Sequence, residues 1–171
     1  MIFVRTQQEL DAIPAGTTDE ICIQFGTIRK PAIVSKKNYT TPIKVQGKFC
    51  LTAFECSRVI ACDESFVEAK DKSYVEAKGN SRVIAYDQSS VRAYQNSNVE
   101  LYDKSGACAI QNSVVTIYGS GEVYAEGAEG SSVQVKAYAD SRVLARDHVK
   151  LTPPTPHGVG FLSTFFSLIH Q

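Results

Sequence analysis

The chain has 171 residues, 18 Lys and Arg against 18 Asp and Glu, 43% hydrophobic residues, 11 Gly, 6 Pro and no Trp. This composition is typical of one soluble globular domain and excludes collagen-like, disordered and membrane-spanning proteins. A formal net charge of zero provides no long-range attraction for nucleic acid, so we expect no direct nucleic-acid binding.

Neither end of the sequence predicts a membrane segment. Residues Met1 to Glu9 lack the apolar core of a secretory signal, and the apolar stretch from Val159 to Ile169 is too short to cross a bilayer. We therefore expect a cytoplasmic protein without membrane association. The five cysteines are odd in number and show no CxxC spacing, which predicts free thiols rather than disulfides or a zinc site.

Residues 1–40 are predicted to form an N-terminal cap. Thr6 to Glu9 reads Thr-Gln-Gln-Glu, a capping-box pattern, which predicts a short helix from about Gln7 to Ile13. After this helix, Ile21, Ile23 and Phe25 alternate as in a β-strand, and Ala32 to Val34 is a second strand candidate.

Residues 41–152 contain an octapeptide repeat. Apart from two ten-residue units, Gly121 to Gly130 and Ser131 to Asp140, the units have eight residues, and thirteen units reach His148. The third place is apolar in every unit and is usually Val, and the fifth is apolar in every unit and is usually Ala. The longer units predict two-residue bulges, one near Gly127 to Gly130 and one near Ala139.

Each octad predicts one short strand and one corner. Alternation places the third and fifth side chains on one face, as a half-buried strand requires. Asp, Gly, Asn, Gln and Ser fill the last two places and the first, and these residues favour turns. Such small modules must stack to bury enough apolar surface, so the sequence predicts an all-β fold, a parallel β-solenoid (β-helix) of about thirteen octapeptide units.

Two coil geometries fit this repeat. Two octads per coil give two flattened faces, and three octads give a triangular coil that would stack Ile60, Ile84 and Cys108. The two-faced coil is favoured because Val and Ala fill a thin interior but leave a wide one under-packed. It predicts an outward column of tyrosines from alternate octads, with Lys70 below them and Glu76 beside Arg92 on the opposite face. The column consists of Tyr86, Tyr102 and Tyr118.

Residues 153–171 are predicted to form a Pro/Gly hinge and an apolar helix. Pro153, Pro154 and Pro156 end the strand pattern, and apolar residues then recur at helical spacing. Two main roles remain open for this helix: it caps the last coil, or it joins two copies in a homodimer or contacts a partner. Binding to a membrane surface is the least favoured role, because the polar face lacks Lys and Arg. The candidate oligomerisation residues are Phe161, Leu162, Phe165, Phe166 and Ile169.

No catalytic residue, metal site or cofactor is predicted. The three histidines, His148, His157 and His170, follow the repeats or end them, unlike the catalytic histidine that lies between coils in hexapeptide-repeat acyltransferases. Nucleotide, dinucleotide, zinc-protease and hydrolase motifs do not occur. Aspartates at the seventh place alternate irregularly with Gly, Gln and Glu, which favours turn capping over calcium ladders.

The pattern S-x-V-x-A-x-(D/G/N)-x, as in Ser65 to Asp71 and Ser81 to Gln88, resembles octapeptide-repeat proteins of phage, prophage and gut-bacterial genomes. This resemblance covers about two-thirds of the chain and carries over no functional residue. It implies a small protein of a virus or mobile element, a class that includes inhibitors of bacterial immune systems and virion parts.

Two functions are considered. In the first, the protein is a non-enzymatic binding protein whose rigid rod presents Tyr86, Tyr94, Tyr102, Tyr118 and Arg92 to a protein partner. The most specific version of this hypothesis is an anti-CRISPR-like or other anti-defence inhibitor of a host defence complex. In the alternative, the protein is a structural component, such as a virion part or a cytoskeletal-type polymer, that assembles through its ends.

Overall fold

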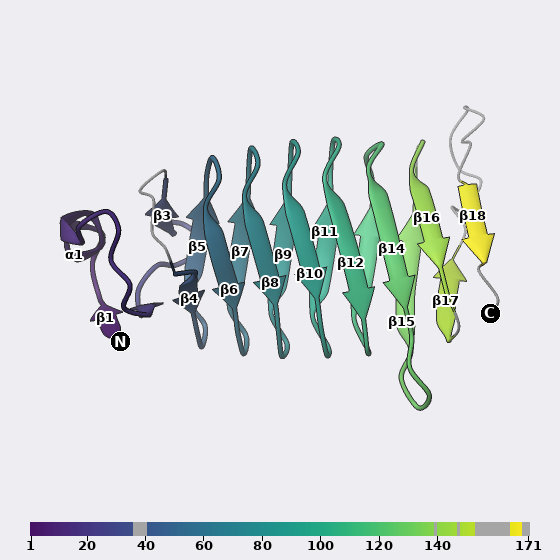
Figure 1. Cartoon of the computed structure of the whole chain (residues 1–171), viewed down its shortest axis with the longest axis horizontal. Coiled ribbons are helices and arrows are strands. Elements are labelled where there is room, and N and C mark those ends of the chain that lie inside the picture. Colours follow the sequence, from purple (N-terminus) through teal and green to yellow (C-terminus); the bar gives the residue numbers. More distant parts are fainter. Residues whose placement is uncertain (36–40, 139, 147, 153–164, 169–171) are drawn as a thin grey trace.

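The computed structural model describes residues 1–35, 41–138, 140–146, 148–152 and 165–168. From its second strand onward the chain passes alternately through two parallel sheets that lie face to face, and this arrangement confirms the predicted all-β parallel solenoid (Figure 1). The ten-stranded sheet contains, in spatial order, β1 (Ile2–Val4), β2 (Ile21–Ile23), β4 (Ile43–Val45), β6 (Arg58–Ala61), β8 (Tyr74–Ala77), β10 (Ser90–Ala93), β12 (Gly106–Ile110), β14 (Glu122–Glu126), β16 (Arg142–Ala145) and β18 (Phe165–Leu168). The eight-stranded sheet contains β17 (Val149–Thr152), β15 (Val133–Ala137), β13 (Val114–Ile117), β11 (Asn98–Leu101), β9 (Arg82–Ala85), β7 (Phe66–Ala69), β5 (Cys50–Ala53) and β3 (Ala32–Val34).

The strand register follows alternate octads. Val75 of β8 pairs with Val59 of β6 on one side and with Val91 of β10 on the other, in each case 16 residues away. Consecutive octads therefore belong to opposite sheets. Ile60 lies on β6 in the ten-stranded sheet and Ile84 on β9 in the eight-stranded sheet, so the stack expected for a triangular coil does not form.

The interior is a narrow, dry layer of third-place and fifth-place side chains. Val67, Val83 and Val99 are each 0% exposed, as are Ala69 and Ala85. Burying one Val side chain contributes roughly 1.5–3 kcal/mol relative to leaving it in water. First-place serines are also buried, and two of them donate to the backbone carbonyl three residues earlier: Ser89 to Tyr86 at 2.7 Å and Ser105 to Tyr102 at 2.6 Å. Other buried first-place serines, such as Ser65, Ser81 and Ser97, have no hydrogen-bond partner for their hydroxyl among the described residues.

The corners that follow β5, β7, β9 and β11 form an acidic rim, which we define as Glu55, Asp71, Asp87 and Asp103. All four have positive φ, between 54° and 58°, a conformation that Asp tolerates better than most residues. The Asp87 carboxylate accepts a hydrogen bond from the backbone N–H of Asp71 at 3.0 Å, and Asp103 accepts one from Asp87 at 3.2 Å. The sequence correctly predicted capped corners, but the bonds join successive coils rather than neighbouring residues.

The corners that follow β8, β10 and β12 form an amide rim, which we define as Asn80, Gln95, Asn96, Gln111 and Asn112. Gln95 Oε1 accepts from the backbone N–H of Gly79 at 2.6 Å, and Gln111 Oε1 accepts from that of Gln95 at 2.9 Å. The same inter-coil bond therefore uses carboxylates on one rim and neutral amides on the other.

The two ten-residue units produce one insertion rather than the two bulges that the sequence predicted. Val115 pairs with Val135, and Val123 with Val143, so that partners are 20 residues apart instead of 16. All four extra residues lie in the corner between β14 and β15, which protrudes from the amide rim at the lower edge of Figure 1. Sequence alternation could not place this insertion, because shifting a strand by two residues keeps the same side chains inward.

The predicted N-terminal helix is present as α1 (Gln7–Ala12). The Thr6 side chain accepts a hydrogen bond from the backbone N–H of Glu9 at 3.2 Å, as the capping pattern implied. The Gln7 side chain bonds both backbone groups of Ile33 in the terminal strand β3, at 2.8 and 2.9 Å. This amide therefore satisfies polar groups that the last strand of a sheet leaves without a partner. The strands predicted near Ile21 and Ala32 are β2 and β3.

The predicted C-terminal helix is wrong where the structure describes it. Residues 165–168 form strand β18, which pairs in parallel with β16, and Phe165 and Phe166 lie opposite Arg142 and Val143. An open sheet edge offers a row of backbone hydrogen-bonding groups, and a strand satisfies them where a helix cannot. Phe161, Leu162 and Ile169 lie outside the described residues. Within the part that the structure describes, no helix is long and apolar enough to cross a bilayer.

Candidate protein-binding surface

One edge of the eight-stranded sheet carries a column of aromatic side chains. Each comes from the place directly after a strand, where the chain leaves β9, β11, β13 or β15. The third-place and fifth-place residues point inward, so this sixth place points outward. We define the tyrosine ladder as the four stacked residues Tyr86, Tyr102, Tyr118 and Tyr138.

The rings of the ladder stack nearly parallel at close to the coil spacing. Centroid distances are 5.2 Å between Tyr86 and Tyr102, 5.0 Å between Tyr102 and Tyr118, and 5.2 Å between Tyr118 and Tyr138. The corresponding interplanar angles are 18°, 19° and 8°. Such pairs contribute about 0.5–1.5 kcal/mol each beyond the area that they bury. The predicted ladder of three tyrosines is confirmed.

Sequence reasoning missed two aromatic residues of this column, Tyr138 at one end and Phe54 at the other. Tyr138 stands at the eighth place of its ten-residue unit, and it joins the ladder because Val135 and Ala137 form the inward pair of β15. At the other end, the Lys70 ammonium lies 5.5 Å from the Phe54 ring centroid and 5.8 Å from that of Tyr86. Aligning Val135 with the third place would have revealed Tyr138.

The ladder presents ring edges and hydroxyl groups rather than ring faces. The faces of Tyr86, Tyr102 and Tyr118 cover one another, and Tyr118 is 43% exposed. Four rings fixed by stacking have little rotational freedom to lose on binding, which lowers the entropic cost of a contact. The ladder is therefore a flat, pre-organised surface with an apolar body and a row of hydrogen-bonding groups.

A row of charged residues beside the ladder holds the Tyr102 ring through a hydrogen bond. The Tyr102 hydroxyl donates to Glu100 Oε2 at 3.3 Å, and the Arg82 guanidinium donates to Glu100 Oε1 at 2.6 Å. Below them, the Lys70 ammonium lies 3.7 Å from the Glu68 carboxylate. Burial, followed by the negative charge of Glu100, raises the pKa of the Tyr102 phenol. Burial also raises the pKa of Tyr86, with a smaller effect from Glu68.

Two residues predicted for the same surface lie on the other sheet. Arg92 belongs to β10 and Tyr94 follows it, eight residues from Tyr86, which places both on the ten-stranded sheet. The Arg92 guanidinium carbon lies 5.4 Å from the Tyr94 ring centroid. Arg92 is also paired in register with Glu76, as expected, but the Glu76 carboxylate forms its ion pair with Lys78 at 2.9 Å.

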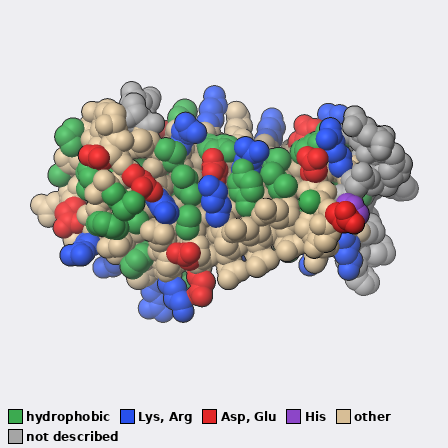
Figure 2. Space-filling model, turned by 60° about the horizontal axis from the view of Figure 1, so that its bottom comes forward, with side chains coloured by type: hydrophobic (Ala, Val, Ile, Leu, Met, Phe, Trp, Pro, Cys, Tyr) green, Lys and Arg blue, Asp and Glu red, His purple; other side chains and the backbone are tan. Residues whose placement is uncertain are grey.

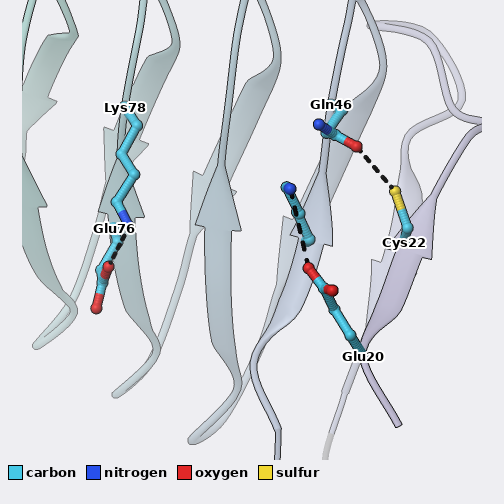
Figure 3. A network of polar contacts seen from close by, with 6 residues as sticks. Glu20, Cys22, Gln46, Glu76 and Lys78 are labelled. Atoms are coloured by element: carbon cyan, nitrogen blue, oxygen red, sulfur yellow. Dashed lines mark hydrogen bonds and ion pairs between the residues drawn. The ribbon is translucent and has the colours of Figure 1, made fainter. Parts of the chain in front are cut away.

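The buried thiol of Cys22 has a hydrogen-bond partner. Cys22 is 0% exposed and donates to Gln46 Oε1 at 3.3 Å, next to an ion pair between Lys44 and Glu20 (Figure 3). Burial raises the pKa of Cys22, which favours the neutral thiol over the reactive thiolate. All five cysteines are free, as predicted. Among the described residues, no group of three or more His, Cys, Asp or Glu is arranged to hold a metal ion.

The Glu100→Gln substitution should lower the pKa of the Tyr102 phenol. The raised pKa in the folded state means that stability from this phenol is present below the unfolded value of about 10 and is lost as the pH rises through the folded value. Removing the carboxylate should shift tyrosinate formation, measured by ultraviolet absorbance, to lower pH. Tyr102→Phe identifies the Tyr102 contribution, and an unchanged titration after Glu100→Gln would contradict the assignment.

No protein-family model, curated protein or solved structure matches this chain.

Proposed function

We propose that this chain is a non-enzymatic, protein-binding β-solenoid built from thirteen octapeptide units, two per coil. In its sharpest form it is a phage-encoded inhibitor that occupies a surface of a bacterial defence complex in the cytoplasm of the host cell. The tyrosine ladder carries this proposal, because it places stacked aromatic rings in one line on a rigid sheet edge.

The chemistry of the ladder fits a protein partner. Tyr and Arg are enriched among the residues that dominate binding energy at protein interfaces, where they insert as large, rigid anchors. The Tyr102 hydroxyl and the Arg82–Glu100 pair are held in fixed positions beside the rings. The partner should therefore offer an apolar strip with hydrogen-bonding groups along one side. An inhibitor of this kind acts by covering the surface that the defence complex needs for its target.

The test replaces three of the four ladder tyrosines and compares the result with a matched change on the other sheet. The ladder variant is Tyr86→Ser, Tyr102→Ser and Tyr118→Ser, and the control variant is Tyr74→Ser, Tyr94→Ser and Tyr124→Ser, which removes the same number of rings from the ten-stranded side. Circular dichroism and thermal unfolding establish that both variants fold. Affinity capture from a host lysate identifies the partner, and the affinity is then measured with purified components.

We expect the ladder variant to bind its partner at least about 30-fold more weakly, since losing several aromatic anchors costs about 2 kcal/mol or more. The control variant should keep its affinity within about threefold. In cells that carry the defence complex, the unchanged chain and the control should restore phage plating, and the ladder variant should not. Equal capture by the two variants would reject this surface.

Self-assembly is the second candidate function. The outer edges of β17 and β18 pair with no strand among the described residues, and open edges of this kind favour association with another chain. Light scattering of the full chain against a chain that ends at Pro156 separates the two functions. A closed dimer agrees with the binding protein, whereas filaments that grow with concentration favour a structural component.

A further inference from the structure

The amide rim borders a groove that the binding proposal does not use. The groove has a volume of about 630 Å³ and runs along the corners after β8, β10 and β12, where the protruding β14–β15 corner closes one end. Figure 2 turns this rim toward the viewer, and the lower middle of the molecule is tan, the colour of uncharged polar side chains and backbone. The groove lies at the corners where the chain leaves the ten-stranded sheet. The tyrosine ladder lies where the chain leaves the eight-stranded sheet.

The inter-coil bonds decide which end of each amide faces the groove. Gln95 Oε1 and Gln111 Oε1 accept from backbone N–H groups, and Asn112 Oδ1 accepts from the backbone N–H of Ser132 at 2.9 Å. A backbone N–H needs an oxygen acceptor, so the oxygen of each amide side chain makes the inter-coil bond and the NH₂ group points away from that bond. Among the described residues, no group accepts from these three NH₂ groups, which leaves a row of neutral donors.

The wall of the groove is held in place by its own hydrogen bonds. The Ser131 hydroxyl donates to the carbonyl of Ala128 at 2.9 Å and accepts from its N–H at 2.8 Å. The bond from Ser132 to Asn112 fastens the same corner to the amide rim. A site whose wall and floor are already ordered loses little entropy when a ligand binds.

The lining indicates the kind of ligand. It contains no Lys or Arg for an anion, and its only carboxylate among the described residues belongs to Glu129. Of the described residues that line the groove, only Ala128 has an apolar side chain, so a hydrophobic ligand would gain little. The ligand that matches NH₂ donors and one carboxylate acceptor is neutral and rich in hydroxyl groups, because each hydroxyl both accepts and donates.

We propose that this groove binds an uncharged linear oligosaccharide that lies along the solenoid axis. Sugar hydroxyls accept from the NH₂ groups of Gln95, Gln111 and Asn112, and one hydroxyl donates to the Glu129 carboxylate. Successive coils repeat at about 4.8 Å, which presents donors at a regular spacing to a chain of repeating units.

The experiment uses Gln-to-Glu substitutions on the full chain. Gln95→Glu with Gln111→Glu keeps an oxygen for each inter-coil bond, as the carboxylates of the acidic rim do, while it removes the NH₂ donors and adds two negative charges. The matched control is Asp87→Asn with Asp103→Asn on the acidic rim. Calorimetric titration with cellohexaose, maltohexaose and chitohexaose measures binding, and a Gly-Ser decapeptide tests the competing class of extended peptide.

We expect at least one hexasaccharide to bind, the Gln variant to bind it at least about tenfold more weakly, and the control to bind it as the unchanged chain does. The ladder variant Tyr86→Ser, Tyr102→Ser, Tyr118→Ser should also keep this binding, which separates the groove from the proposed protein interface. The proposal is overturned if no hexasaccharide binds, if the Gln variant binds equally well, or if only the peptide binds.

Discussion

Gly121→Ala is expected to destabilise the fold by more than about 4 kcal/mol and to leave most of the chain unfolded. Gly121 is buried in the corner between β13 and β14, at the first place of its unit, where most units have Ser. A Cβ atom added here would overlap the backbone carbonyl of Ser105 in the previous coil. Because this neighbour is backbone and is held by its own sheet, it cannot move aside as a flexible side chain would.

Gly106→Ala is the control for this substitution. Gly106 lies in β12, and the nearest backbone atom to its added Cβ would be the Glu122 carbonyl oxygen at 3.1 Å. We expect a change below about 1 kcal/mol, since Ala forms strands at least as well as Gly. Urea unfolding followed by circular dichroism measures both variants. Similar stability of the two would show that the corner at Gly121 relaxes.

Leu101→Ala is expected to destabilise the protein by about 2–5 kcal/mol. Leu101 is 0% exposed and is paired in register with Ala85 on one side and Ile117 on the other. Its removal leaves a cavity next to Ile117, and neighbouring strands fixed in a ladder cannot close it. The repeat alone would suggest the opposite result, because Ala is the usual fifth-place residue and the substitution restores the common octad.

Thermal and urea unfolding of Leu101→Ala separate these two expectations. Ile110→Ala is a suitable control, since Ile110 is an outward, half-buried residue at the end of β12. We expect this control to lose less than about 1 kcal/mol. If Leu101→Ala were as stable as the control, the interior at this coil would be able to contract to the width of an Ala–Ala layer.

Much of the candidate surface was predictable because the octads from Tyr86 to Tyr118 all have the same length. Tyr86, Tyr102 and Tyr118 share the sixth place of alternate octads, so a two-octad coil stacks them without any further information. Tyr138 escaped prediction because the ten-residue units can be aligned in two ways that bury equally apolar residues. Tyr94 and Arg92 are of the same residue types as Tyr86 and Arg82 beside the ladder, but their octad belongs to the opposite sheet.

The repeat by itself determined the parallel solenoid, the inward Val and Ala, and the polar corners, because a period of two within a period of eight permits one buried face and one turn per unit. Three features were decided by tertiary structure alone: the insertion gathered in the β14–β15 corner, the strand at residues 165–168 and the inter-coil bonds that orient the rim side chains. Each depends on backbone groups brought close by a neighbouring coil, and those partners are far away in the sequence.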